Sequence, residues 1–225
     1  MKKTLAIKAI TFDLDNTLID FLHMKKKASN AAVRAMVRNG LNMSVKKAED
    51  ELFRIYLKDI EGHTAFQEFL NNHYAFTEKR LAAAISAYTK IKLKYLKPYP
   101  KVKATLNAMK KKGLKLAIIS DAPKLNVWKR LGALGIAGYF DVIVGLEDTG
   151  RKKPSKMPFK KALKLLRMKP SEVLHVGDWP ERDVKGAKKL GMKTCLAKYG
   201  WDEGKYVKPD YEIEKIEELI RIISN

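Results

Sequence analysis

The stretch FDLDNTL, residues 12–18, decides the fold because it places two carboxylates directly after an apolar segment. That segment, Leu5 to Phe12, predicts a first β-strand. Side chains alternate in extended backbone, so Asp13 and Asp15 are expected to project to one side while Leu14 packs on the other. A hard divalent cation with oxygen ligands would relieve the repulsion between the two carboxylates. The simpler alternative is a strand that ends in an Asp/Asn turn.

Other short apolar segments predict the rest of a sheet. The main segments are Leu116 to Ser120, Val173 to Gly177 and Met192 to Ala197, and weaker ones are Val142 to Gly145 and Tyr211 to Ile213. The main segments do not alternate strictly, which is typical of strands buried on both faces of a parallel sheet. Helical patterns lie between them: Pro100 to Gly113, Pro123 to Leu134 with Asp121 as a possible N-cap, a helix after Ser155, and Pro180 to Leu190. The predicted fold class is α/β, with a doubly wound, Rossmann-like parallel sheet.

The segment from residue 20 to residue 97 lacks this alternation of strands and helices. It contains apolar residues at helical spacing in four places: Ala28 to Val37, Ala48 to Ile60, Thr64 to Asn71 and Glu78 to Tyr95. We therefore expect an all-helical insert over 20–97, with residues 1–19 and 98–225 forming the core around the sheet.

Further polar residues follow the predicted strands. Ser120 and Asp121 offer a hydroxyl and loop amides that can hold a phosphate. Lys153 supplies a cation just before Pro154, and Asp178 and Asp183 flank the start of a helix. Each has a structural alternative, as a helix cap, a solvated lysine or a turn former. Because all of them lie at carboxyl ends of strands, we expect them to share one site.

With these residues the chain resembles the haloacid dehalogenase-like hydrolase superfamily. The four stretches that carry the resemblance are FDLDNTL at 12–18, Ser120 after an apolar strand, Lys153 before Pro154, and GDWPERD at 177–183. The resemblance covers nearly the whole chain. It implies that Asp13 is a nucleophile, that Asp15 is a general acid and base, and that the helical insert is a cap that closes over the substrate.

The resemblance also implies how phosphate and metal are bound. Ser120 and Lys153 would hold the transferring phosphoryl group. Asp178, Asp13 and the backbone carbonyl of Asp15 would bind magnesium, and Asp183 would support the site. The implied activity is that of a Mg-dependent phosphatase, which cleaves small phosphorylated metabolites through an aspartyl-phosphate intermediate. Asp15 must start protonated to assist the leaving alkoxide, so its site has to raise its pKa.

Three alternative functions remain at this point. A 2-haloacid dehalogenase of the same fold also uses an aspartate nucleophile, but halide needs no proton, so Asp15 favours phosphoryl transfer. A phosphomutase shares the phosphatase machinery, and contacts of the cap would distinguish the two. A nucleic-acid-binding or scaffold protein would use the net charge of +21, from 46 basic and 25 acidic residues. The basic residues are dispersed and no binding motif is present, so no nucleic-acid partner is expected.

The remaining conspicuous residues predict modest roles. Cys195 is the single cysteine and is expected to pack in a strand. His175 is predicted to be a packed or edge histidine, and no role is assigned to His23 or His63. Trp179 is the tryptophan most suited to the rim of the pocket. No apolar run is long enough to span a bilayer and no signal peptide is evident, so a cytoplasmic protein is expected.

Overall fold

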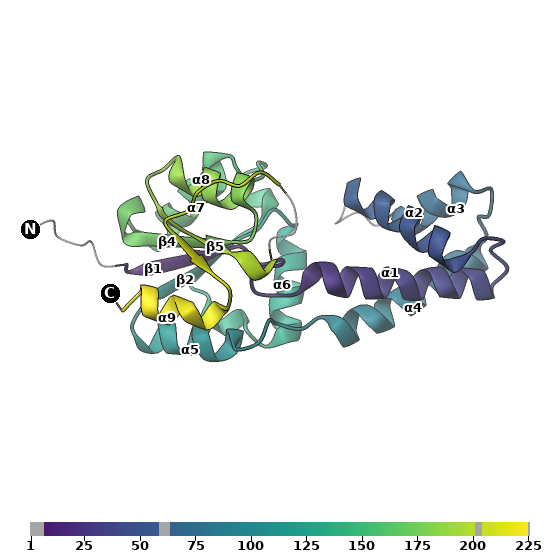
Figure 1. Cartoon of the computed structure of the whole chain (residues 1–225), viewed down its shortest axis with the longest axis horizontal. Helices are drawn as coiled ribbons and strands as arrows, with labels where there is room; N and C mark the ends of the chain where they lie inside the picture. Colours follow the sequence, from purple (N-terminus) through teal and green to yellow (C-terminus); the bar gives the residue numbers. More distant parts are fainter. Residues whose placement is uncertain (1–6, 59–63, 201–203, 225) are drawn as a thin grey trace, which may run out of the picture. The chain divides into compact units, whose positions relative to one another are not determined.

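The computed structural model describes residues 7–58, 64–200 and 204–224 and divides the chain into two units. One unit comprises Met1–Asp20 and Pro98–Asn225, and the other is Phe21–Lys97. Figure 1 shows the sheet in the first unit and helices in the described part of the second. The predicted boundaries, at residues 19/20 and 97/98, lie within one residue of these, and the roles of the two units as catalytic core and cap remain predictions.

The first unit is built on a six-stranded sheet in the order β3-β2-β1-β4-β5-β6, and every neighbouring pair is parallel. The strands are β1 Ala9–Phe12, β2 Lys115–Ile119, β3 Val142–Val144, β4 Val173–Gly177, β5 Lys193–Ala197 and β6 Tyr211–Ile213. The predicted doubly wound parallel sheet is therefore confirmed. Ser120 lies just beyond β2 rather than in it, and residues 5 and 6 of the first predicted strand lie outside the described residues.

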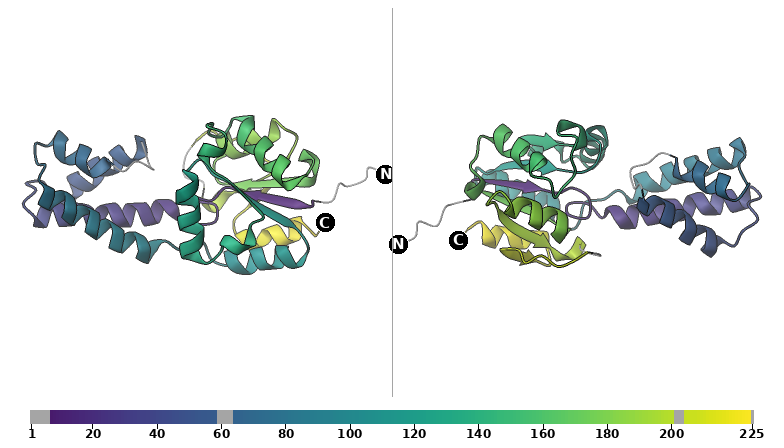
Figure 2. Two further views of the ribbon diagram at one scale, coloured as in Figure 1. Left: turned by 180° about the vertical axis from the view of Figure 1, so that it is seen from behind. Right: turned by 90° about the horizontal axis from the view of Figure 1, so that it is seen from above.

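Helices cover both faces of the sheet, with α7 and α8 on one face and α5 and α9 on the other (Figures 1 and 2). Their bounds are α5 Val102–Lys111, α6 Lys124–Leu134, α7 Lys156–Leu166, α8 Lys185–Lys188 and α9 Leu219–Ile222. Ser155 caps α7 by accepting a hydrogen bond from the backbone N–H of Met157. The apolar side of α7 is buried with β1–β4 residues, as its spacing predicts.

Two helix predictions are wrong. The N-cap of α6 is Pro123 rather than Asp121, because the Asp121 carboxylate accepts a hydrogen bond from the backbone of Lys153 instead. The helix expected over Pro180 to Leu190 is not one α-helix: a π-helical turn, Pro180–Val184, leads into the short α8. The Asp183 side chain accepts the Trp179 N–H, so this turn is shaped by a bond that apolar spacing does not reveal.

The second unit contains α1 Phe21–Arg38, α2 Val45–Lys58, α3 Ala65–Asn72 and α4 Glu78–Tyr95. The insert is thus helical as predicted, and its own apolar core draws on all four helices. Arg80 links the segment after α1 to the segment before α4 by donating hydrogen bonds to the backbone carbonyls of Asn39, Gly40 and Ala75 at 2.7–3.0 Å. His63 lies outside the described residues. Among the helices that the structure describes, none is long and apolar enough to cross a membrane.

Candidate active site

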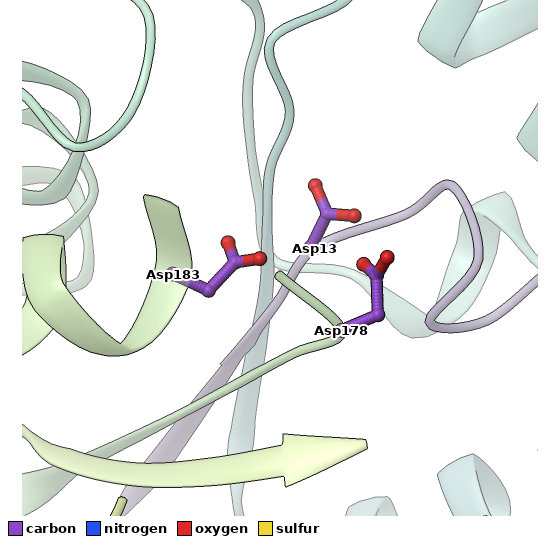
Figure 3. Close-up of side chains that lie close together, drawn as sticks. All are labelled: Asp13, Asp178 and Asp183. Carbon is purple, nitrogen blue, oxygen red and sulfur yellow. The ribbon is translucent and has the colours of Figure 1, made fainter. Parts of the chain in front are cut away.

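Three buried carboxylates converge at the carboxyl edge of the sheet. Asp13 follows β1, Asp178 follows β4, and Asp183 comes from the π-helical turn (Figure 3). One oxygen from each lies within 4.8 Å of the others, a spacing that could hold a metal ion. Their exposed fractions are 8%, 6% and 1%. The carboxyl ends of β1 and β4 meet because these strands are parallel neighbours at the centre of the sheet.

Lys153 supplies the positive charge of this cluster. Its Nζ lies 2.5 Å from Asp13 Oδ1 and 2.7 Å from Asp183 Oδ1, and the residue is 5% exposed. Its backbone N–H donates to Asp121 Oδ1 at 2.8 Å, which fixes the loop that carries it. The neighbouring Lys152 is exposed, so Lys153 is the lysine of this loop whose charge is buried at the site. A cation is therefore held directly against the predicted nucleophile.

The electrostatics of the cluster are dominated by burial. Burial raises the pKa of Asp13 to about 7, opposed by the charge of Lys153 and reinforced by Asp183 and Asp15. Burial, together with the charges of Asp13 and Asp183, raises the pKa of Asp178 well above its usual range. Asp183 differs: its burial is outweighed by Lys153 and His175, and its pKa is lowered. Asp13 and Asp178 therefore gain most from an added cation.

The oxygens of these carboxylates differ in their existing partners. Both oxygens of Asp183 accept hydrogen bonds, Oδ1 from Lys153 and Oδ2 from the backbone N–H of Trp179 at 3.1 Å. Asp178 Oδ1 accepts from the Thr17 hydroxyl at 2.9 Å. The donor set of hard carboxylate oxygens suits a divalent cation. The ligand roles that the resemblance implies for Asp13 and Asp178, and the supporting role that it implies for Asp183, are compatible with this arrangement and remain predictions.

Asp15 has a different environment from Asp13, although only one residue separates them. Its Oδ2 accepts a hydrogen bond from Arg130 Nη1 at 2.6 Å, and Arg130 is 5% exposed. β1 ends at Phe12 and Asn16 adopts a left-handed φ of 60°, so the simple alternation expected of a strand does not extend through this turn. The side chain of Asp15 is outside the carboxylate cluster, and its predicted ligand role through the backbone carbonyl remains a prediction.

Sequence reasoning missed Arg130. The signal was available, because Arg130 lies on the side of α6 that also buries Val127, Leu131 and Leu134. A charged residue on the apolar side of a helix is seldom buried without a partner. Asp15 is that partner, and it lies more than a hundred residues earlier in the chain.

Ser120 lies at the carboxyl end of β2 and is 4% exposed. Its hydroxyl accepts the backbone N–H of Ala122 at 3.1 Å, and its own N–H donates to Val144 on β3. The residue is thus held in a tight turn at the same sheet edge as Asp13. Its predicted role in holding a phosphoryl group is compatible with this position and remains a prediction.

The packing predictions for His175 and Cys195 are confirmed, and the pocket-rim position of Trp179 remains a prediction. His175 is buried, as expected, and lies between Thr11 and Asp183. The Trp179 ring is covered by the Arg182 guanidinium at 3.9 Å from the ring centroid. Cys195 is a buried free thiol whose pKa is raised by burial, which fits packing rather than catalysis.

With this geometry established, comparison with known proteins identifies the family. The sequence pattern of the haloacid dehalogenase-like hydrolases matches residues 10–197. The chain therefore belongs to the haloacid dehalogenase-like hydrolase family, as its four motifs predict. The matched range includes the carboxylates after β1 and β4, Lys153 and the whole helical unit.

Relatives of similar length carry names of phosphatases. The chain is 33% identical to a glyceraldehyde 3-phosphate phosphatase of Methanopyrus kandleri, over 96% of this chain and 97% of the relative. It is 31% identical to a phosphoglycolate phosphatase of Aquifex aeolicus, over 97% and 98%. Among solved structures, an HAD phosphatase from Thermococcus onnurineus is similar with a TM-score of 0.73 at 26% identity, covering 96% of this chain and 98% of that one.

Proposed function

We propose that the protein is a magnesium-dependent phosphatase that cleaves small phosphate monoesters through an aspartyl-phosphate on Asp13. The observation that carries this proposal is the buried contact between Lys153 Nζ and Asp13 Oδ1 at 2.5 Å, beside Asp178. An ammonium group placed against a nucleophilic carboxylate offsets the repulsion between that carboxylate and an anionic phosphoryl group. The named activities of the relatives support the same reaction class.

The metal would be held by Asp13, Asp178 and the backbone carbonyl of Asp15. When bound, magnesium would neutralise charge on the phosphoryl group and orient it for in-line attack. Lys153 and Ser120 would hold the phosphoryl oxygens from the other side. Thr17 would keep the Asp178 carboxylate in place through its 2.9 Å hydrogen bond. The raised pKa of Asp178 reflects how strongly this pocket disfavours unbalanced negative charge.

Asp15 would deliver a proton to the leaving alkoxide and then take one from the attacking water. Arg130, which lies on α6, donates a hydrogen bond to one oxygen of Asp15. This bond holds the Asp15 carboxylate in a fixed orientation. Asp13 attacks phosphorus, the ester bond to the leaving oxygen breaks, and the leaving oxygen takes the proton of Asp15. Water then hydrolyses the acyl phosphate, which returns Asp13 as a carboxylate and releases inorganic phosphate.

We further propose that the substrate is a small cytoplasmic metabolite such as a two- or three-carbon phosphate. The two relatives above are named for substrates of that size. The net charge of +21 favours anionic substrates in general and does not select among them. The helical unit Phe21–Lys97 would act as a cap and choose the substrate.

The test is a phosphate-release screen over phosphorylated metabolites, run with metal-free protein and again after Mg²⁺ is restored. Release that requires the metal, with highest kcat/KM on small phosphates, is the expected result. Full activity after exhaustive metal removal would contradict the metal requirement. Halide release from 2-haloacids without hydrolysis of any phosphoester would replace the phosphatase by a dehalogenase. Transfer of phosphate within a sugar phosphate, without net release, would indicate a phosphomutase.

A further inference from the structure

A chain of buried hydrogen bonds runs beneath the site and includes two residues to which the proposed reaction gives no role. Thr11 on β1 and His175 on β4 are register partners in the parallel sheet. Thr11 Oγ1 lies 2.9 Å from His175 Nδ1, and His175 Nε2 lies 3.1 Å from Asp183 Oδ1. Thr11 is 0% exposed and His175 is 1% exposed, so water does not compete for these bonds.

The chemistry of the two ends determines which ring nitrogen carries the proton. Asp183 is a carboxylate whose pKa is lowered, so its oxygen accepts and His175 Nε2 must donate. Burial lowers the pKa of His175, which favours the neutral ring. In a neutral ring with hydrogen on Nε2, Nδ1 is an acceptor, and the Thr11 hydroxyl then donates to it. The Asp183 carboxylate thus selects the tautomer, and the Thr11 hydroxyl, which can donate or accept, satisfies the remaining ring nitrogen.

Asp183 connects the His175 ring to Lys153. Its Oδ1 accepts from both His175 Nε2 and Lys153 Nζ, while its Oδ2 accepts from the backbone of Trp179. A Cβ at Gly177 would overlap the Asp183 side chain, so the glycine allows the carboxylate to approach the end of β4 closely. The same Lys153 ammonium contacts Asp13 Oδ1, which completes an unbroken path from Thr11 to the nucleophile.

We propose that His175, held between Thr11 and Asp183 as the Nε2–H tautomer, is a positioning residue that orients Asp183 and thereby aims the Lys153 ammonium at Asp13. This inference rests on the proposed function for its kinetic consequence, but the hydrogen-bond path itself does not. His175 touches neither Asp13 nor Lys153 through any bond that the structure describes, so it acts through Asp183. Small displacements of a positioned charge lower the rate of a reaction that depends on orientation.

The first experiment measures kinetics of four variants with Mg²⁺ present. His175→Leu removes the donor to Asp183, and we expect kcat to fall about 10–100-fold with KM changed much less. His175→Gln places an amide donor near the position of Nε2 and should recover a large part of that loss. Thr11→Val removes the hydroxyl that donates to His175 Nδ1 while keeping the shape, so the ring is held less firmly and a smaller fall of kcat is expected.

Thr194→Val is the matched control. Thr194 is also a fully buried strand threonine, and its hydroxyl donates to Asp210 at 2.7 Å, outside the site. It should lower the melting temperature about as much as Thr11→Val while leaving kcat unchanged. If the two threonine variants lose kcat equally, or if His175→Leu retains wild-type kcat, the positioning role is overturned.

The second experiment reads the tautomer directly in metal-free protein, by the nitrogen-15 shifts and couplings of the His175 ring. We expect the pattern of a neutral ring with hydrogen on Nε2 in the wild type and in Thr11→Val, and a mixture of tautomers in Asp183→Asn, whose amide can donate as well as accept. A wild-type ring with hydrogen on Nδ1 alone would overturn the proposal. Because this readout needs no turnover, it remains decisive if no phosphoester is hydrolysed, a result that would defeat the proposed function instead.

Discussion

The sheet-bearing unit and the helical unit Phe21–Lys97 bury charge in different ways. In the sheet-bearing unit, five charged residues are buried near the carboxyl edge of the sheet: Asp13, Arg130, Lys153, Asp178 and Asp183. Lys153 pairs with Asp13 and Asp183, Arg130 pairs with Asp15, and Asp178 accepts a hydrogen bond from Thr17. Among the described residues of the helical unit, Lys25 is the only buried charged side chain. Its Nζ lies over the Tyr56 ring, 3.9 Å from the centroid.

The difference teaches what each unit must do with its charges. The carboxylate cluster sets three carboxylates against one ammonium, and burial raises the pKa of Asp13 to about 7, so an added cation would favour the ionised carboxylates. In the helical unit, the buried ammonium of Lys25 lies against an aromatic cluster that includes Tyr56 and Tyr88. We therefore expect substitutions in the carboxylate cluster to alter turnover, and substitutions around Lys25 to alter mainly stability or substrate choice.

The largest effect is expected from Asp13→Asn. Removal of the nucleophile should lower turnover by at least ~10⁴-fold. The fold should remain, because the substitution also removes a carboxylate whose ionisation burial disfavours. Turnover at saturating substrate and the melting temperature check both parts. Wild-type-like turnover, with contamination excluded, would rule out Asp13 as the nucleophile.

Asp15→Asn is expected to have the next largest effect, and it separates phosphatase from dehalogenase chemistry. An alkoxide leaving group needs a proton, so turnover of alkyl phosphates should fall ~10²–10⁴-fold. The loss in phenol release from an aryl phosphate should be smaller, because that leaving group needs less help. A burst of phenol followed by slow turnover would support both roles of Asp15, as acid and as base. Equal losses on both substrates in the burst phase would contradict the acid role.

One arginine in each unit allows the effects on turnover and on stability to be compared directly. Arg130→Lys keeps a charge near Asp15 but loses the planar donor group, so turnover of alkyl phosphates should fall by about tenfold, less than in Asp15→Asn. Arg80→Lys disturbs three hydrogen bonds to backbone carbonyls in the helical unit, and should lower the free energy of unfolding by about 1–3 kcal/mol. Turnover of the smallest substrates and urea unfolding of both variants separate these outcomes. Similar losses of turnover in both variants would contradict a kinetic role for Arg130 and a structural role for Arg80.

The sequence predicts the sheet because buried parallel strands are near-continuous apolar segments between helices. It also places Asp13, Lys153, Asp178 and Ser120 at one edge, since the carboxyl ends of parallel strands meet there. It does not predict the partner of Asp15, because the pairing with Arg130 depends on how α6 packs. Apolar spacing likewise misses the π-helical turn, which places the Asp183 carboxylate where Lys153 and His175 reach it.

A pH effect of intermediate size follows from the pKa of Asp13. In metal-free protein this pKa is about 7, above the ordinary value of 3.8, so the folded state holds the proton more tightly than the unfolded state. The associated stability is present at low pH and is lost as pH rises through about 7. The shift of Asp178 acts in the same direction. Asp183 has a lowered pKa, so its stabilising contribution is lost only in more acidic solution.

Urea unfolding of metal-free protein between about pH 5 and about pH 8 measures this effect. We expect the free energy of unfolding to decrease with pH in the wild type, and to decrease less in Asp13→Asn. Saturating Mg²⁺ should flatten the wild-type curve, since a bound cation favours the ionised carboxylates. An identical slope in wild type and variant would show that Asp13 does not carry the effect.

The smallest effect is expected from Lys25→Met, judged against Lys153→Met. Both variants replace a buried ammonium by an apolar side chain of similar length. Lys153→Met leaves Asp13 and Asp183 without their shared cation, so turnover should be lost almost completely. Lys25→Met gives up a cation–π contact but also removes the cost of burying the charge, so the free energy of unfolding should change by about 1 kcal/mol or less.

Lys26→Met, at the exposed neighbouring position in α1, is the control for the loss of one surface charge. Turnover of the smallest phosphoesters should stay within about threefold of wild type for both α1 variants. A residue that does not contact the reacting groups affects substrate binding, and hence KM, more than it affects kcat. A changed ranking among larger substrates, in Lys25→Met alone, would give the helical unit its proposed part in substrate choice. A loss of turnover as large as that of Lys153→Met would instead show that Lys25 takes part in the reaction, and the contrast between the two units would fail.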